Sequence, residues 1–305
     1  MSILIIGGSG FIGRNLTAAL LNKDQTVIVK TRNKQNTSTL FSSIGCEPTI
    51  IDNYDELLSL ETLPETTISL AGAGIVDKRW TDQRKKELTD SRITPLRELH
   101  QWLQKQQVTF NTLLVGSATG YYGLPEDPDQ ELTENSIPTP HFTAELCGQL
   151  EHYGSSMSDV YQQISILRTG VVLGDGGALE KMTLPAKFHL NGKIGNGQQW
   201  LSWIHIDDWI RGILHILHQA SPQPSYNLTA PNPATNQQFS QAIGNALGKK
   251  LQIPVPALSI KLLLGEASAL LLRSQRVLPE ALLESGFKFN FEEIEHACND
   301  LLSTT

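Results

Sequence analysis

A glycine-rich segment close to the start of the chain has the composition and spacing of a phosphate-binding turn. Residues 3–13 read ILIIGGSGFIG, an aliphatic run that leads into Gly7, Gly10 and Gly13. Glycine lets the backbone turn tightly and approach a diphosphate, whose charge is stabilised at the N-terminus of the following helix. Strand, glycines and helix in this order predict a dinucleotide site, and a ligand-free strand-to-helix turn is the alternative. The residues expected to contact the dinucleotide are Gly7, Gly8, Ser9, Gly10, Phe11, Ile12 and Gly13.

The end of the second predicted strand indicates which dinucleotide would bind. An Asp or Glu there would hydrogen-bond the adenosine 2′-hydroxyl and favour NAD. Here the strand runs into Lys30, Thr31, Arg32 and Asn33, without a carboxylate. Because a guanidinium binds phosphate through charge-assisted contacts, Thr31 and Arg32 predict a 2′-phosphate site and NADP(H) as cofactor. A solvated basic turn is the alternative.

Small residues follow the fourth predicted strand, where the sequence at 70–74 reads LAGAG. Such residues let the chain pass close to the nicotinamide half of a bound cofactor, although a plain turn would have the same composition. Leu70, Ala71 and Gly72 are therefore predicted to contact the cofactor.

Candidate catalytic side chains follow the fifth predicted strand. Ser117 ends this strand and could hydrogen-bond a substrate carbonyl or alcohol, or simply cap a turn. Tyr121 and Tyr122 come next, and a phenol can transfer a proton to or from a substrate oxygen. Packing or positioning is the alternative role of both tyrosines.

Four other side chains are candidates for contact with a small-molecule substrate. Lys78 and Arg79 follow the fourth strand's glycine loop and could face a substrate anion, or belong to a solvated loop. Arg168 ends the sixth predicted strand and could contact substrate, with a buried ion pair as the alternative. His205 could contact the substrate, but its place between two isoleucines equally suits a buried structural histidine.

Strand-like and helix-like segments alternate through roughly the first two-thirds of the chain. This order predicts an α/β fold, a Rossmann-type doubly wound parallel sheet, whose ligands bind beyond the C-terminal ends of the strands. We expect this domain over residues 1–170, with contributions from later segments, and a smaller C-terminal substrate lobe over 171–305. A helical module is expected from about residue 250. The expected strands are Ser2–Ile6, Thr26–Thr31, Pro48–Ile51, Thr67–Leu70, Thr112–Ser117 and Ser165–Arg168, and the expected helices are Phe11–Leu21, Tyr54–Leu60, Thr81–Gln104 and Phe142–Met157.

Composition excludes several classes of function. The chain has 305 residues and a formal net charge of −7, so it lacks the basic surface that binds nucleic acid or anionic lipid. Its three cysteines have no metal-ligand spacing and suit the cytoplasm, so no metal site is expected.

The apolar stretch Ala257–Leu272 contains two charges and is too short for a bilayer, which predicts a buried or partner-facing helix rather than membrane association. The two long predicted helices, Thr81–Gln104 and Phe142–Met157, could pair across a two-fold axis in a homodimer.

Several motifs together resemble the extended short-chain dehydrogenase/reductase superfamily, and in particular its YfcH-like branch of epimerase-family proteins. The resemblance covers essentially the whole chain and implies a Rossmann domain, a nicotinamide cofactor and a small C-terminal domain of unknown function. The motifs are Ala71–Trp80 (AGAGIVDKRW), Ser117–Gly123 (SATGYYG), Arg168–Leu173 (RTGVVL), Ile194–Asp208 (IGNGQQWLSWIHIDD) and Ser274–Pro279 (SQRVLP).

The chain departs from this superfamily at the catalytic pair. The superfamily uses Ser with Tyr-x-x-x-Lys, in which tyrosine transfers the proton while lysine lowers its pKa and holds the nicotinamide ribose. Aligning Glu151 with the usual Lys-x-x-x-Glu puts Thr143 at the tyrosine position and Cys147 at the lysine position. Threonine is too weak an acid, and cysteine supplies no fixed cation.

Two functional hypotheses follow from this departure. The first is an NADP(H)-dependent oxidoreductase or nucleotide-sugar-epimerase-like enzyme with a rebuilt acid–base set and an unidentified substrate. The second is a non-catalytic NADP(H)-binding protein with a regulatory or interaction role.

Overall fold

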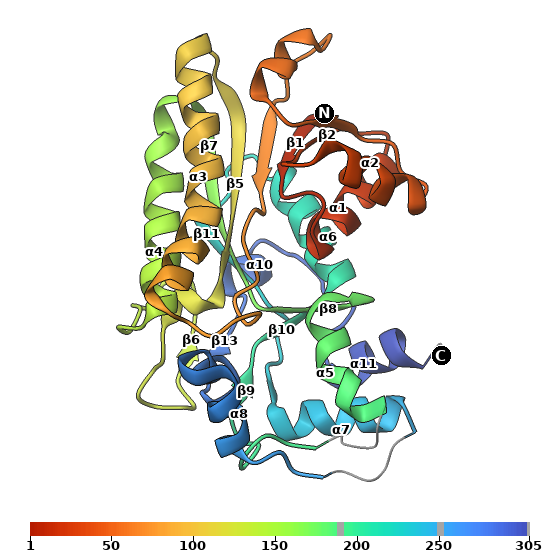
Figure 1. Ribbon diagram of the computed structural model, residues 1–305, viewed down its shortest axis with the longest axis vertical. Helices are drawn as coiled ribbons and strands as arrows, with labels where there is room; N and C mark the ends of the chain where they lie inside the picture. Colours follow the sequence, from red (N-terminus) through yellow and green to blue (C-terminus); the bar gives the residue numbers. More distant parts are fainter. Residues whose placement is uncertain (188–191, 249–252, 304–305) are drawn as a thin grey trace.

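The computed structural model describes residues 1–187, 192–248 and 253–303 (Figure 1). Its centre is a seven-stranded sheet in the order β11-β7-β5-β4-β1-β2-β3, and every pairing in it is parallel. The predicted α/β doubly wound fold is therefore confirmed. The strands are β1 (Ser2–Ile6), β2 (Thr26–Lys30), β3 (Thr49–Ile51), β4 (Thr66–Ser69), β5 (Phe110–Ala118), β7 (Tyr161–Thr169) and β11 (Ser225–Leu228).

The strand order reverses at β1, because β2 and β3 continue on one side of it while β4, β5 and β7 continue on the other. Such a reversal opens a crevice at the C-terminal ends of the strands, where doubly wound proteins bind their ligands. The glycine turn after β1 and Ser117 in β5 both lie at this edge. The sheet thus brings together the two parts of the predicted site.

Helices cover both faces of the sheet, as buried parallel strands require. The side chains of β1 alternate between two apolar cores: Ile3 and Ile5 pack in one, and Leu4 and Ile6 in the other. Helices α1 (Phe11–Leu21) and α6 (Ile206–Leu217) close the first core, and α3 (Asp82–Gln106) and α4 (Phe142–Ser155) close the second (Figure 1).

Two short elements join the strands near the sheet edge. The segment predicted as the helix Tyr54–Leu60 is the 3-10 helix η1 (Tyr54–Ser59). Helix α2 (Lys34–Ser43) is not predicted from the sequence, because its polar residues show no clear apolar periodicity. It begins where the side chain of Asn33 accepts a hydrogen bond from the backbone N–H of Asn36 at 2.9 Å.

The later part of the chain forms small two-stranded pairings and a separate core around Trp203, Phe239 and Ile294. Helix α10 (Glu280–Glu284) begins after Pro279 and is followed by Gly286 with φ +80°, as the sequence predicts. The remaining elements are η2 (Thr119–Tyr122), β6 (Glu131–Leu132), η3 (Ser156–Asp159), β8 (Val171–Gly174), α5 (Gly177–Lys187), β9 (Trp200–Leu201), β10 (Trp203–His205), β12 (Ala234–Thr235), α7 (Asn236–Ala246), β13 (Arg276–Val277) and α11 (Ile294–Leu302).

The apolar stretch 257–272, predicted to be a buried or partner-facing helix, is neither a single helix nor buried throughout. It is divided into α8 (Ala257–Leu264), the 3-10 helix η4 (Gly265–Ser268) and α9 (Ala269–Leu272), because Gly265 has φ +60°. No residue of α8 is buried. Its exposed leucines are Leu258, Leu262 and Leu263. Among the described residues, no helix combines the length and the apolar character needed to cross a membrane.

Candidate functional site

Three glycines of the turn after β1 are required by the protein's own packing. Gly7 has φ +85°, and a Cβ there would lie 2.7 Å from the backbone nitrogen of Ala71. A Cβ at Gly13 would lie 2.4 Å from the carbonyl oxygen of Gly7, and one at Gly8 would meet Val29 at 2.9 Å. These contacts bring β1, α1 and the end of β4 close together.

Gly10 differs from its neighbours because the fold does not demand a glycine there. Its φ of −70° suits any residue, and an added Cβ would meet only the carbonyl oxygen of Gly7, at 3.4 Å. The space beside Gly10 is therefore left open by the protein. This space is the cradle that a diphosphate needs in order to approach the backbone.

The N-terminus of α1 has no side-chain cap and no nearby negative charge that would compete with an anion. Gly10 is its N-cap residue and provides no side-chain hydrogen bond, and no acidic residue occurs in the first turn. The first N–H groups of a helix have no partner within it, and the helix dipole adds partial positive charge. The residues of the turn therefore fit the diphosphate of a dinucleotide.

The basic residues near the end of β2 differ in whether their charged groups already have partners within the protein. Lys34 forms an ion pair with Glu56, and Lys30 lies over the ring of Tyr54 at 5.1 Å. Arg32 is exposed, and no ion pair of its guanidinium is found in the part of the chain that the structure describes. Thr31 lies beside it, with its hydroxyl 2.8 Å from that of Thr37. The Arg32 guanidinium is therefore available to a phosphate, whereas the Thr31 hydroxyl already has hydrogen-bond partners in Thr37 and Asn33.

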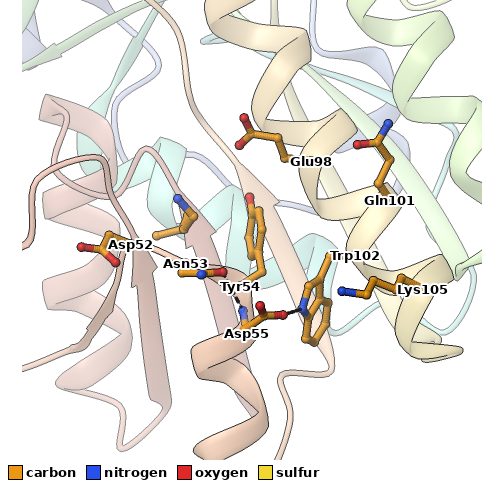
Figure 2. Close-up of a pocket in the computed structure, with 9 residues that line it drawn as sticks. Asp52, Asn53, Tyr54, Asp55, Glu98, Gln101, Trp102 and Lys105 are labelled. Carbon is orange, nitrogen blue, oxygen red and sulfur yellow. Dashed lines mark hydrogen bonds between the residues drawn. The ribbon is translucent and has the colours of Figure 1, made fainter.

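A cavity of about 590 Å³ lies between η1 and the C-terminal half of α3 (Figure 2). It reaches Lys30 and Asp52 at the ends of β2 and β3, and it does not reach Ser117. Inside it, Asp55 accepts a hydrogen bond from the indole N–H of Trp102 at 2.8 Å. Burial raises the pKa of the Tyr54 hydroxyl well above its usual range. The cavity is thus lined by carboxylates, and by none of the predicted catalytic residues Ser117, Tyr121 and Tyr122.

Ser117 belongs to a buried hydrogen-bond network. Its hydroxyl donates to Oε1 of Glu151 on α4, at 2.7 Å. Glu151 in turn accepts hydrogen bonds from Nε and Nη2 of Arg168 on β7, the latter at 2.9 Å. Burial by itself would lower the pKa of the Arg168 guanidinium, but the Glu151 carboxylate more than compensates and raises it.

This network changes the expected role of Arg168. The guanidinium was predicted to contact substrate, with a buried ion pair as the alternative, and the structure shows the ion pair. The side chains of Arg168 and Glu151 are 7% and 9% exposed, so they contact each other rather than a ligand.

The two tyrosines after β5 have different environments. Tyr122 is fully buried, and its hydroxyl donates to Oδ1 of Asn227 at 2.6 Å and accepts from Nη1 of Arg168. Burial raises the pKa of Tyr122 to about 12. The structure therefore argues against Tyr122 as a proton donor, because its hydrogen is already engaged. Tyr121 is half-buried, with the Arg168 guanidinium 3.5 Å from its ring centre, and stays the candidate of the two.

Helix α4 carries the residues aligned with the missing catalytic pair. Thr143 is buried, and its hydroxyl lies 2.8 Å from Nδ1 of His141, the N-cap residue of this helix. Burial raises the pKa of the Cys147 thiol to about 11, although a hydrogen bond with Ser117 opposes the shift. Cys147 is therefore a neutral thiol near pH 7 and supplies no charge.

Arg79 and Lys78, two of the predicted substrate contacts, lie in the loop after β4. Arg79 donates hydrogen bonds to the carbonyl oxygens of Leu262 and Leu263, at the C-terminal end of α8. Lys78 beside it is exposed. Arg79 thus joins the loop after β4 to the C-terminal module, a contact between segments that are far apart in the sequence.

His205 does not face the crevice, which corrects its predicted role. It is 1% exposed, its ring stacks on Phe291 at 3.8 Å between ring centres, and its Nδ1 accepts a hydrogen bond from the backbone N–H of Asp207. Burial lowers the pKa of His205, which favours the neutral ring. The side chain is enclosed because the segment before α11 covers it.

Two residues near the crevice are not identified by sequence reasoning as parts of the site. Glu151 is the partner of Ser117, and Arg92 on α3 packs against the loop after β4. Glu151 served only to align its helix with Lys-x-x-x-Glu, and Arg92 belongs to no recognisable motif. Charged residues on helices usually face solvent, so neither position indicated these contacts. No group of residues that could hold a metal ion occurs in the described ranges.

Comparison with known proteins establishes the family. The model described as the NAD dependent epimerase/dehydratase family matches residues 3–229. The chain belongs to this family. A second model, a domain of unknown function (DUF1731), matches residues 255–301. The expected combination of an epimerase-family chain with this C-terminal domain is therefore confirmed.

Relatives of similar length carry the same general description. The chain is 33% identical over 311 residues to the epimerase family protein YfhF of Bacillus subtilis, covering 99% of this chain and 98% of that protein. It is likewise 33% identical over 308 residues to the epimerase family protein SAR0825 of Staphylococcus aureus, with 98% of each covered.

Solved structures agree with this family membership. The human epimerase family protein SDR39U1, solved with NADPH, matches with a TM-score of 0.86 and 30% identity over the whole of both chains. UDP-glucuronic acid 4-epimerase from Bacillus cereus matches with a TM-score of 0.78 over 100% of this chain and 98% of that chain. Its 17% identity shows a shared fold alone.

Proposed function

We propose that this family member binds NADP(H) and acts as an oxidoreductase or nucleotide-sugar-epimerase-like enzyme on a small-molecule substrate. The observation that carries the proposal is the open space at Gly10 against the uncapped N-terminus of α1. The NADPH named with the human family member adds support. When bound, the nicotinamide supplies the hydride donor or acceptor, and the chain's own residues bind, orient and handle the proton.

Each predicted cofactor contact has a role in this proposal. The backbone N–H groups at the start of α1 bind the diphosphate, and Thr31 and Arg32 bind the 2′-phosphate. Leu70, Ala71 and Gly72 lie along the nicotinamide half at the end of β4.

The network around Ser117 determines how it meets the substrate. Because the Ser117 hydrogen is donated to Glu151, its oxygen can act only as an acceptor. The Cys147 thiol occupies one acceptor position, and the other is left for a substrate hydroxyl. Ser117 therefore positions an alcohol, and Tyr121 is the candidate for proton transfer. The substrate class is a molecule with an oxidisable secondary hydroxyl, such as a sugar ring.

Arg32→Glu tests the choice of nucleotide. Replacing the guanidinium by a carboxylate should weaken NADPH binding by about a hundredfold, because attraction to the 2′-phosphate becomes repulsion. NADH lacks that phosphate, so its dissociation constant should change about twofold or less. Titration calorimetry with both nucleotides measures the effect, and the exposed Lys23→Glu is the matched control. An unchanged ratio of the two constants would show that Arg32 does not select the phosphate.

A non-catalytic NADP(H)-binding role is the second candidate, favoured by the exposed leucines of α8 and by the neutral Cys147 thiol. A spectrophotometric screen for NADPH oxidation with small carbonyl compounds and nucleotide sugars separates the two candidates. Steady turnover that Ser117→Ala removes would support the enzyme.

We further propose a cytoplasmic location, which suits the unpaired cysteines Cys46, Cys147 and Cys298.

A further inference from the structure

Arg92 is a partly buried cation without an acidic partner. It lies on α3, and among the described residues its guanidinium forms no ion pair. Its hydrogen bonds go to neutral oxygens: Nη1 donates to the carbonyl of Leu88 at 2.8 Å, and Nη2 donates to the carbonyl of Ala73 at 3.1 Å. Burial lowers the pKa of Arg92, so the fold holds this charge at a cost.

The guanidinium lies at the end of β4, against the loop assigned to the nicotinamide half of the cofactor. A Cβ added at Gly72 would be 2.9 Å from Cζ of Arg92, so only a glycine lets the guanidinium pack this closely on the backbone. The carbonyl of Ala73 anchors it from the same loop. Its position is therefore set by both α3 and the segment after β4.

On its other side, Arg92 approaches the position of the missing lysine. The charge of Arg92 acts on the Cys147 thiol, and that thiol is hydrogen-bonded to Ser117 at the end of β5. Arg92 thus lies at the C-terminal end of β4, on the face of the sheet where α4 carries Cys147. In a doubly wound sheet with the diphosphate on α1 and the adenosine over β2, the nicotinamide half extends toward β4 and β5.

The guanidinium also has donor capacity that the protein does not use. Arginine has N–H donors on Nε as well as on both terminal nitrogens. No hydrogen bond of Nε is found in residues 1–187, 192–248 and 253–303, and Nη1 otherwise reaches only the Ser91 hydroxyl, at 3.5 Å. A partly exposed cation with an unused donor is suited to bind the oxygens of a ligand.

We propose that Arg92 binds the nicotinamide half of NADP(H), through its ribose hydroxyls, and supplies there the fixed positive charge that Cys147 cannot provide. The inference rests on the proposed function, because it requires a cofactor in the crevice. It assigns a cofactor-binding residue that comes from α3 rather than α4.

A positive charge at this place has an electrostatic consequence. The nicotinamide ring is cationic in NADP⁺ and neutral in NADPH, so Arg92 repels the oxidised form. The wild-type protein should therefore bind NADPH more tightly than NADP⁺. A purely structural arginine would not produce a preference that depends on the redox state of the ring.

Arg92→Met and Arg92→Lys test the proposal in titration calorimetry with three nucleotides: NADPH, NADP⁺ and adenosine 2′,5′-bisphosphate, which lacks the nicotinamide half. Arg92→Met should weaken NADPH binding by about tenfold, since charged hydrogen bonds are lost. It should leave the bisphosphate within about twofold and reduce the preference for NADPH over NADP⁺. Arg92→Lys keeps the charge and should retain that preference. Arg97→Met, on the exposed side of the same helix, is the matched control.

The outcomes distinguish this inference from the proposed function. If the folded wild-type protein binds none of the three nucleotides, the proposed function fails. If wild type binds NADPH but Arg92→Met binds it equally well, only the role of Arg92 is overturned. Equal weakening of NADPH and the bisphosphate, with a lower melting temperature than Arg97→Met, would show that Arg92 acts through the fold.

Discussion

Gly10→Val should abolish the binding of both NADPH and NADH while leaving the protein folded. The valine side chain would occupy the space through which a diphosphate reaches the N–H groups of α1. Loss of two or more charge-assisted hydrogen bonds corresponds to a dissociation constant raised by about a hundredfold or more. The backbone at Gly10 suits valine, since its φ is −70° and an added Cβ meets no atom closer than 3.4 Å. Calorimetry measures the binding, and circular dichroism checks the fold.

Two other glycines provide controls for this result. Gly148→Val lies on α4, where an added Cβ meets no atom within 4 Å, and it should leave nucleotide binding unchanged. Gly13→Ala, by contrast, would place its Cβ 2.4 Å from the Gly7 carbonyl oxygen and should lower stability together with binding. If Gly10→Val binds NADPH within about threefold of wild type, the diphosphate does not lie at this turn.

Glu151→Gln should lower the free energy of unfolding by about 3 kcal/mol, because it leaves the buried Arg168 guanidinium without its counter-charge. The Gln amide also offers N–H groups where Arg168 needs an acceptor. The Ser117 hydroxyl loses a charged acceptor in the same change, so the position of its oxygen in the crevice becomes less defined. Urea denaturation followed by fluorescence measures the loss.

A double-mutant cycle separates the ion pair from other effects of this change. Combining Glu151→Gln with Arg168→Met removes both charges and should cost less than the sum of the two single changes. Glu145→Gln, at an exposed position of the same helix, is the matched control and should cost about 0.5 kcal/mol or less. Equal losses for Glu151→Gln and Glu145→Gln would show that the pair contributes little to stability.

Local sequence patterns predicted most of the cofactor domain. The strand Ser2–Ile6 and the helix Phe11–Leu21 have the predicted bounds, because an aliphatic run, glycines and helical periodicity lie next to each other in the chain. The other predicted strands are present with ends shifted by a few residues, for example β7 (Tyr161–Thr169). Strand ends shift because hydrogen bonds to neighbouring strands, rather than the residues themselves, determine where pairing stops.

Roles that depend on distant partners could not be predicted in the same way. Arg79 follows a glycine loop and therefore suggested a substrate contact, yet its partners on α8 are more than 180 residues away. His205 was a candidate for substrate contact, and only the fold shows Phe291 stacked on it.

The sequence by itself determined the doubly wound fold, the glycine turn after the first strand and the absence of Tyr-x-x-x-Lys, because each depends on residues that are close in the chain. The tertiary structure alone decided that Ser117 donates to Glu151, that Arg168 neutralises this carboxylate and that Arg92 stands at the end of β4. Burial and hydrogen bonding of a charged side chain depend on which elements pack around it, and that packing is fixed only when strands and helices from distant parts of the chain assemble.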